Sequence, residues 1–337
     1  MIPVIFGLAG LTLTDEERRF FSSVQPAGFI LFGRNIADPE QVRALTEDLR
    51  AINGQPCLPI LVDQEGGRVV RLKPPHWPAF PPAERFDRLY HQAPASAIAA
   101  ARSNGLALAL TLVDVGININ CAPMLDVRQT SGHDIVGDRS FGSDAMQVAA
   151  LGGAMLDGMA AGGAVGVVKH VPGHGRACCD SHHDLPTVDA SPDQLLQDMA
   201  PFAALAGKAR IAMTAHIVYR AWDKDSPATL SPTIISSVIR QQIGFSGLLL
   251  SDDIEMNALT GPVADRAKAA IAAGCDIVLH CSGDMAAMQA IAAALSPISQ
   301  GTLDRLERAR SGSLGSADPA RLEQALAHRD ALLALAA

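Results

Sequence analysis

Short apolar runs alternate with longer amphipathic stretches along nearly the whole chain. Buried strands of a parallel sheet are apolar on both faces, so they are written as continuous runs and not as alternating positions. The runs that fit this description predict strands over residues 3–8, 28–32, 59–62, 117–121, 165–169, 211–215, 247–251 and 276–280.

The stretches between these runs carry helix start signals. Thr14 is followed three residues later by Glu17, as in a capping box, and Asp38 precedes a proline suited to the first helical position. Ser191 and Ser231 also each precede a proline. Ala-rich segments over 95–112, 144–161 and 265–273 are typical of helices packed closely on a sheet. Eight strand–helix units predict the α/β class and a single (β/α)8 barrel, with a doubly wound open sheet as the alternative.

Three stretches depart from this rhythm. Residues 74–82 are rich in proline and predict a long loop after the third strand, and residues 170–186 predict another after the fifth. Beyond residue 283 the pattern is helical over 285–295, 303–310 and 319–335. We expect one catalytic domain over residues 1–337, with a C-terminal helical extension from about residue 301 packed on the outside of the barrel.

Composition narrows the function classes. The 337 residues carry a formal net charge of −8 with no basic block, which gives no electrostatic reason to bind nucleic acid or anionic lipid. No apolar run approaches the roughly 20 residues of a membrane helix. The apolar N-terminus lacks a basic leader, and the six cysteines show no disulfide-framework or CxxC spacing. We therefore expect reduced thiols and a cytoplasmic location; a monomer is the default for the oligomeric state.

Polar residues crowd the ends of five predicted strands. They are Asp63 to Arg68 with Arg71, Asp126 with Gly137 to Gly142, Lys169 with His170, His216, and Ser251 to Asp253. The carboxyl ends of barrel strands meet at one face, which is where barrel active sites lie. A strand-end aspartate can simply cap the next helix, but five such clusters at one end favour an active site.

The most informative segment is Lys-His-Val-Pro-Gly-His-Gly at 169–175, followed by Asp180-Ser181-His182. This run resembles the signature of glycoside hydrolase family 3, specifically its bacterial β-N-acetylglucosaminidases of peptidoglycan recycling. The similarity extends to residues 62–71, 137–142 and 251–256, in the family's order. Val171 stands where the family usually has phenylalanine.

The resemblance implies a retaining glycosidase whose nucleophile is Asp252. A carboxylate can trap the sugar as a covalent glycosyl-enzyme, and Asp253 has the same chemistry, so the residues alone leave both open. The family motif selects Asp252, and Asp253 is then interpreted as a cap or supporting residue.

The acid/base in this resemblance is His182, paired with Asp180. A histidine titrates near neutral pH, and a carboxylate can set its tautomer and stabilise its charged form. A local turn is the other interpretation of Asp180 to His182. We expect the 170–186 loop to close on substrate and deliver His182.

The resemblance also supplies the residues that bind the terminal sugar: Asp63, Arg71, Arg139, Lys169 and His170. An ordinary ion pair is the alternative for Asp63 and Arg71. His174 is interpreted as shaping its loop and His216 as a satisfied core histidine. No cofactor or metal is implied, and the partner is a small disaccharide or muropeptide: N-acetylglucosamine linked β-1,4 to anhydro-N-acetylmuramic acid, with or without peptide.

Three other functions compete with this interpretation. A metal-dependent barrel hydrolase would use His170, His174, His182 and Asp252 as ligands, although no HxH follows the first strand and no HExxH occurs. A non-catalytic carbohydrate-binding role is the second. A family 3 β-glucosidase is the third, but such members usually carry a second α/β domain.

Overall fold

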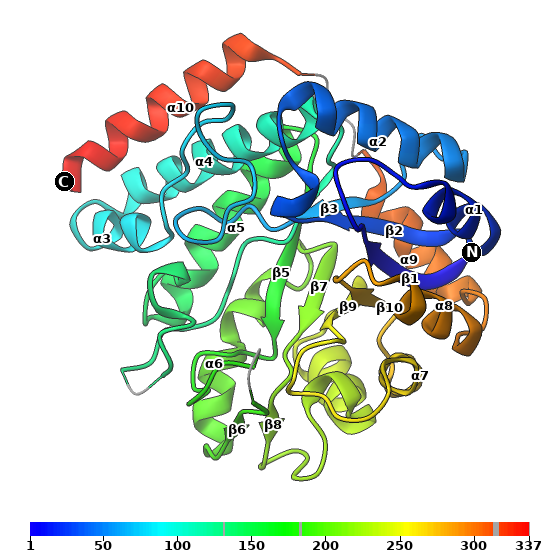
Figure 1. Cartoon of the computed structure of the whole chain (residues 1–337). Helices are drawn as coiled ribbons and strands as arrows, with labels where there is room; N and C mark the ends of the chain where they lie inside the picture. The colour runs from blue at the N-terminus through cyan, green and yellow to red at the C-terminus, as the bar shows by residue number, and fades with distance from the viewer. Residues whose placement is uncertain (131, 182–183, 313–316, 337) are drawn as a thin grey trace.

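The computed structural model describes residues 1–130, 132–181, 184–312 and 317–336. Within these residues, eight parallel strands close into a barrel surrounded by helices (Figure 1). The order around the barrel is β1, β10, β9, β7, β5, β4, β3, β2, so the predicted barrel is confirmed and the open sheet is wrong. The strands are β1 (Ile2–Gly7), β2 (Pro26–Leu31), β3 (Ile60–Val62), β4 (Ile119–Asn120), β5 (Val165–Val171), β7 (Ile211–Thr214), β9 (Leu248–Asp253) and β10 (Ile277–His280).

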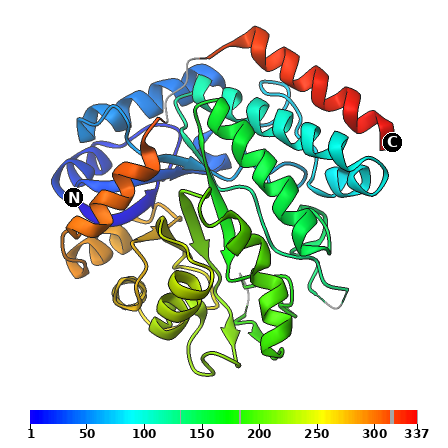
Figure 2. The same cartoon turned by 180° about the vertical axis from the view of Figure 1, so that it is seen from behind.

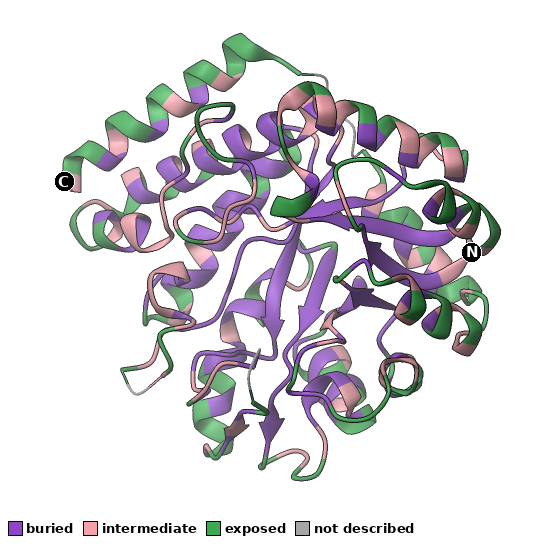
Figure 3. Ribbon diagram, viewed as in Figure 1, coloured by how far each residue is buried: buried purple, intermediate pink, exposed green. Residues whose placement is uncertain are grey.

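Helices cover the outside of this barrel, and their buried faces turn toward the strands (Figure 3). They are α1 (Asp15–Val24), α2 (Pro39–Asn53), α3 (Glu84–Gln92), α4 (Pro94–Asp114), α5 (Ala145–Ala161), α6 (Pro192–Leu205), α7 (Val263–Ala273), α8 (Met285–Ala294), α9 (Gln300–Arg310) and α10 (Pro319–Leu333), with a π-helix over Ile234–Gln242. The predicted capping box is present, because the Glu17 amide donates to the Thr14 hydroxyl and the Thr14 amide donates to the Glu17 carboxylate.

Two hydrophobic clusters show why the strands are continuous apolar runs. One contains alternate strand residues such as Ile5 and Leu250, and the other contains their neighbours Phe6 and Leu249. Side chains of a strand alternate between its two faces. The first cluster therefore fills the barrel interior, and the second packs between the strands and the helices.

Helices α4 and α5 approach each other closely at glycines. A Cβ atom on Gly158 would lie 2.0 Å from the Arg102 carbonyl oxygen, and one on Gly105 would lie 2.2 Å from that of Met155. By length and composition α4 could also cross a membrane, so the expectation that no apolar run reaches that length is wrong for this helix. Of its apolar window, 61% is buried inside the fold, as in the core helix of a barrel.

The C-terminal helices lie on the barrel's outside (Figures 1 and 2). Helix α9 contacts the barrel through Arg305, whose guanidinium donates to the buried Asp276 carboxylate at 2.6 and 2.9 Å. Helix α10 packs along α4, where the Arg329 guanidinium donates to the Asn104 side chain at 3.2 Å. These contacts agree with the expected packing of the extension, and the single domain stays a prediction.

Two features at the carboxyl end of the barrel were not predicted. A small parallel sheet joins β6 (Thr187–Val188) to β8 (Val218–Tyr219). The Tyr219 hydroxyl also donates to the Gly173 carbonyl at 2.8 Å. The long segment after β5 is thereby held near both of its ends.

The segment that begins at Ser231 was expected to be an ordinary helix, but it forms the π-helix.

Candidate active site

A cavity of about 190 Å³ opens among the carboxyl ends of the barrel strands. This is the face on which barrel enzymes place their active sites. Its polar lining residues include Asp63, Glu65, Arg71, Asp126, Arg139, Lys169, His170, His174, Ser181, Asp252 and Asp253.

A chain of alternating charges forms one wall of the cavity. The Lys169 ammonium lies 2.9 Å from the Asp63 carboxylate and 2.7 Å from that of Glu65. The Arg139 guanidinium donates two hydrogen bonds to the Glu65 carboxylate, of 2.8 and 2.9 Å. Arg71 completes the chain at 3.4 Å from Asp63. These residues come from β5 and from the loops after β3 and β4, so the fold joins three separate segments here.

Burial and neighbouring charges shift the pKa values of these paired residues in opposite directions. Burial alone would raise the pKa of Glu65, but the charges of Arg139 and Lys169 hold that pKa well below its usual range. Burial would likewise lower the pKa of Lys169, while Asp63 and Glu65 raise it above its usual range. The groups therefore keep their charges at neutral pH, which suits charge-assisted hydrogen bonds to a polar ligand.

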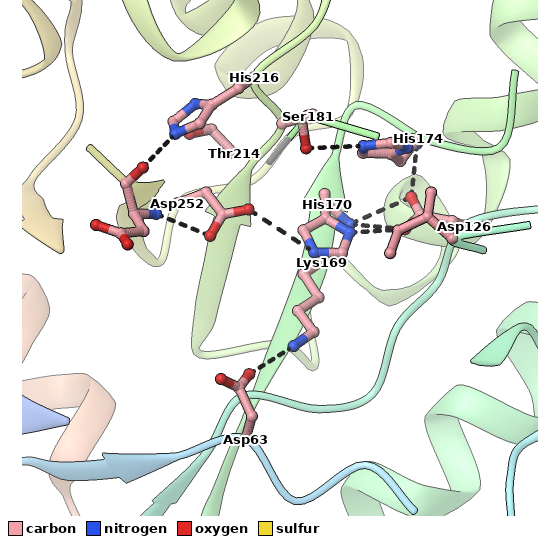
Figure 4. Close-up of polar contacts among 12 residues, drawn as sticks. Asp63, Asp126, Lys169, His170, His174, Ser181, Thr214, His216 and Asp252 are labelled. Atoms are coloured by element: carbon pink, nitrogen blue, oxygen red, sulfur yellow. Dashed lines mark hydrogen bonds and ion pairs between the residues drawn. The ribbon is translucent and has the colours of Figure 1, made fainter. Parts of the chain in front are cut away.

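Asp126 organises a neighbouring part of the cavity lining, where it holds His170 and His174, as Figure 4 shows. Its buried carboxylate accepts the His170 ring Nδ1 at 2.8 Å, the His170 amide at 3.2 Å and the His174 amide at 2.6 Å. Burial would raise the pKa of Asp126, but His170 and these bonds hold it below its usual value. Because an ionised carboxylate only accepts hydrogen bonds, Nδ1 of His170 carries a proton and Nε2 is directed at Asp252, 3.9 Å away.

Asp252 and Asp253 both reach the cavity from the end of β9, but their environments differ. Burial would raise the pKa of Asp252, whereas His170, His216 and the Asp253 amide hold it below its usual value. The Asp253 amide donates to Asp252 Oδ1 at 2.8 Å. Burial instead raises the pKa of Asp253 to about 6, and its carboxylate accepts the Glu255 amide at 3.1 Å. Asp252 is thus the stronger candidate for an anion at neutral pH.

The structure brings most of the predicted site residues together. The cavity is lined by Asp63, Arg71, Arg139, Lys169, His170 and Asp252. Asp180 is half-buried and is not among the lining residues, although its neighbour Ser181 is. His182 lies outside the described residues, so its role stays a prediction, as does closure of the 170–186 loop.

The histidines with other interpretations are also placed. His216 is buried, with Nδ1 at 2.7 Å from the Thr229 hydroxyl and Nε2 at 2.9 Å from the Asp253 carbonyl oxygen, so a satisfied core histidine is confirmed. Within the described part of the chain, no three His, Cys, Asp or Glu side chains are grouped to hold a metal ion. The proposed metal set also needs His182, which is not described.

Glu65 and Asp126 were predicted only as members of the polar clusters at strand ends, with no role of their own in the site. Glu65 lies within the family-like stretch after β3, and Asp126 follows the predicted fourth strand, so strand-end position was the available signal. His174 is more than loop-shaping, because its ring lines the cavity. Burial lowers the pKa of His174 to about 4, which keeps the ring neutral at pH 7.

Known proteins with similar sequences belong to the family that the motifs predict. The chain matches the glycosyl hydrolase family 3 N terminal domain over residues 5–309. It is 36% identical to a beta-hexosaminidase of Aromatoleum aromaticum over 98% of this chain and 92% of that protein. It is 39% identical to a beta-hexosaminidase of Alkalilimnicola ehrlichii over 83% of this chain and 80% of that protein.

Solved structures agree. NagZ from Neisseria gonorrhoeae in complex with N-trifluoroacetyl-D-glucosamine superposes with a TM-score of 0.89 at 31% identity, covering 99% of this chain and 98% of that one. A family 3 beta-N-acetylglucosaminidase from Paenibacillus gives a TM-score of 0.84 at 32% identity, over 97% of this chain and 66% of that one. The cavity, its charged walls and these similarities together show that the chain belongs to glycosyl hydrolase family 3 and is a glycoside hydrolase of the β-hexosaminidase type.

Proposed function

We propose that this enzyme removes terminal β-linked N-acetylglucosamine from peptidoglycan fragments, by a retaining mechanism in which Asp252 is the nucleophile. The substrate is the disaccharide of N-acetylglucosamine and 1,6-anhydro-N-acetylmuramic acid, with or without its peptide. The observation that carries the proposal is Asp252, an ionised carboxylate at the end of β9 that faces a cavity lined with charged hydrogen-bonding groups.

The two oxygens of Asp252 have different surroundings. Oδ1 accepts the Asp253 amide at 2.8 Å, which restrains rotation of the carboxylate. Oδ2 lies 3.9 Å from His170 Nε2, beyond hydrogen-bond distance, and so keeps lone pairs for attack. We therefore assign Oδ2 as the attacking atom.

The charged wall supports recognition of one sugar ring. Asp63, Arg71, Arg139, Lys169 and His170 offer both acceptors and charged donors to hydroxyl groups. Pockets for drug-sized ligands usually occupy about 300–1,000 Å³. The cavity here is smaller, about 190 Å³, and suits the end of a chain better than its middle.

The acid/base in this proposal is His182, assisted by Asp180. Its support is the Asp180-Ser181-His182 motif, together with the cavity-lining position of Ser181. In the first step Asp252 Oδ2 bonds to the anomeric carbon, the glycosidic bond breaks, and His182 gives its proton to the leaving oxygen. In the second step His182 takes a proton from water, the resulting oxygen attacks the anomeric carbon, and the bond to Asp252 breaks.

The family similarity supports the sugar. The Neisseria gonorrhoeae neighbour is solved with N-trifluoroacetyl-D-glucosamine, an N-acylated glucosamine, and the relatives are beta-hexosaminidases. The peptidoglycan origin of the substrate rests on the resemblance of the motifs. A cytoplasmic location is part of the proposal, and it is supported by six free cysteines, since free thiols persist in reducing compartments.

Trapping the intermediate tests the nucleophile. A fluorinated N-acetylglucosaminyl fluoride slows the second step, so the peptide that contains Asp252 gains the sugar mass. Asp253→Asn is the matched control, since it changes the adjacent carboxylate and should still be labelled. Label on any other carboxylate, or none on an enzyme that the reagent inactivates, would overturn the assignment.

Turnover tests the substrate and the acid/base. The enzyme should hydrolyse an aryl N-acetyl-β-glucosaminide far faster than the matching glucoside, and it should keep this activity in excess chelator. His182→Ala should lower kcat with the natural disaccharide by roughly 10²–10⁴-fold, the usual contribution of general acid–base catalysis. Equal turnover of the two aryl substrates, or an unchanged His182→Ala enzyme, would contradict the proposal.

A further inference from the structure

The segment after β5 contains two adjacent cysteines, Cys178 and Cys179, that the proposed reaction does not use. Cys178 is exposed and Cys179 is half-buried, and as chain neighbours they place two free thiols on consecutive residues. The other four cysteines are buried or half-buried, so Cys178 is the most accessible thiol of the chain.

The pair lies between two anchored residues. On one side Ala177 is buried, its amide donates to the His174 carbonyl at 3.0 Å, and its carbonyl accepts the His133 amide at 2.9 Å. On the other side Ser181 is buried, and its carbonyl accepts the Ala258 amide at 3.3 Å. The stretch between these anchors is four peptide bonds long and contains both thiols and Asp180.

We propose that Cys178 and Cys179 are a redox modification site, at which a small disulfide oxidant closes a vicinal disulfide that lowers the hydrolysis rate. Cys178 attacks the oxidant, for example glutathione disulfide, and releases one glutathione thiol. Cys179 then attacks the sulfur of Cys178 and releases the second. One protein disulfide forms, two thiol protons leave with the two glutathione molecules, and the oxidant is reduced by two electrons.

Bond geometry explains why this step would change the site. Disulfide-bonded cysteines usually have Cα atoms about 4.4–6.8 Å apart, whereas adjacent residues are about 3.8 Å apart. The covalent geometry of the chain fixes this shorter distance, so the disulfide ring is strained and closes only when the backbone dihedral angles at the two cysteines change. Because Ala177 and Ser181 are anchored, the movement falls on the peptide units between them, which include Asp180. Strained disulfides are also the easily reduced ones, so the modification is reversible.

The neighbouring charges divide the roles of the two thiols. Partial burial, the Cys178 thiol and the carboxylates of Asp184 and Asp180 raise the pKa of Cys179. A thiol with a raised pKa is a poor first nucleophile. The exposed Cys178 is therefore the attacking thiol and Cys179 the resolving one.

The test treats the full-length enzyme with glutathione disulfide and follows two signals. Mass spectrometry should show that the peptide containing both cysteines loses two hydrogen atoms. The kcat for an aryl N-acetyl-β-glucosaminide should fall at least about tenfold, since small misplacements near a site have such effects, and dithiothreitol should restore it. The mass signal does not depend on activity, so a failed site remains distinguishable from a wrong function.

Serine variants identify the thiols. Cys178→Ser and Cys179→Ser should keep the reduced enzyme's kcat and resist the loss, whereas Cys57→Ser should remain as sensitive as the parent. Phenylarsine oxide, which bridges paired thiols, should bind the parent but neither of the first two variants. Oxidation that joins other cysteines, an unchanged kcat once the vicinal disulfide has formed, or full sensitivity in Cys178→Ser would each overturn the proposal.

Discussion

Replacing Asp126 with asparagine would test whether a buried carboxylate behind the cavity sets the orientation and protonation of His170. Oδ1 of Asp126 accepts the His174 amide at 2.6 Å, and Oδ2 accepts the His170 ring at 2.8 Å. An asparagine can keep one oxygen for the amides. Its NH2 group then faces Nδ1 of His170, so two donors meet unless the imidazole changes tautomer.

The size of the effect follows from the bond that is lost. A hydrogen bond to a charged group such as the Asp126 carboxylate contributes about 1.5–3 kcal/mol, and tenfold in rate corresponds to about 1.4 kcal/mol. Asp126→Asn should therefore lower kcat/KM by roughly 10- to 150-fold. The free energy of unfolding should fall by about 1–3 kcal/mol as well, because Asp126 is fully buried.

Three measurements separate positioning from general damage. Steady-state kinetics with an aryl N-acetyl-β-glucosaminide give kcat and KM separately. Nitrogen NMR of the histidine rings should show the proton on Nδ1 of His170 in the parent and on Nε2 in the variant. Urea denaturation gives the change in stability.

Asp276→Asn is the matched control. Asp276 is also a buried carboxylate, but it lies at the opposite end of the barrel and accepts bonds from Arg240 and Arg305. It should lose similar stability and keep kcat/KM. The reasoning is refuted if Asp126→Asn keeps kcat/KM within about twofold of the parent, or if the two variants lose activity equally.

Further predictions concern packing, pH and binding. Gly158→Ala should lower the free energy of unfolding by about 1–3 kcal/mol in urea denaturation, because the new methyl group would clash with the Arg102 carbonyl; unchanged stability would contradict the close packing of α4 and α5. The pKa of His174 is lowered from 6.5 to about 4. Its neutral ring therefore contributes to the free energy of unfolding above pH 6.5, and this contribution is lost as the pH falls toward 4. Between pH 6.5 and 4 the free energy of unfolding of the parent should fall by up to about 3 kcal/mol more than that of His174→Gln. Parallel pH profiles of stability for the two proteins would contradict a neutral, buried His174 ring. Lys169→Met should reduce kcat/KM by roughly 10- to 150-fold, because Asp63 and Glu65 lose their shared cation; Lys208→Met, at an exposed ion pair, should leave turnover unchanged.

Most of the barrel could be predicted because its strands are buried on both faces. An apolar run such as residues 165–169 predicts a buried strand without knowledge of the strands that pair with it, and β5 indeed begins at Val165. The sheet of β6 and β8 could not be predicted in this way. Its strands are two residues long, and they pair only because the segments after β5 and β7 meet in space.

The site was predictable only to the extent that single motifs carry chemistry. Lys169 and Asp63 stood in recognisable motifs, but nothing local shows that they are partners across 106 residues. Asp126 was noted at a strand end but given no role for the same reason, since its function depends on His170, 44 residues later. Supporting groups of this kind have no signature of their own, because their role is defined by what folding brings beside them.

The carboxylates at this barrel mouth differ in environment more than in chemical type, and that difference is what assigns their roles. Lys169 and Arg139 form ion pairs with Glu65, and the His170 ring is hydrogen-bonded to the Asp126 carboxylate. Burial keeps Asp253 partly protonated near pH 6, since its pKa is raised to about that value. Asp252 combines a lowered pKa, one restrained oxygen and an open face on the cavity. Adjacent aspartates on one strand can therefore serve as nucleophile and support without any difference in their own chemistry.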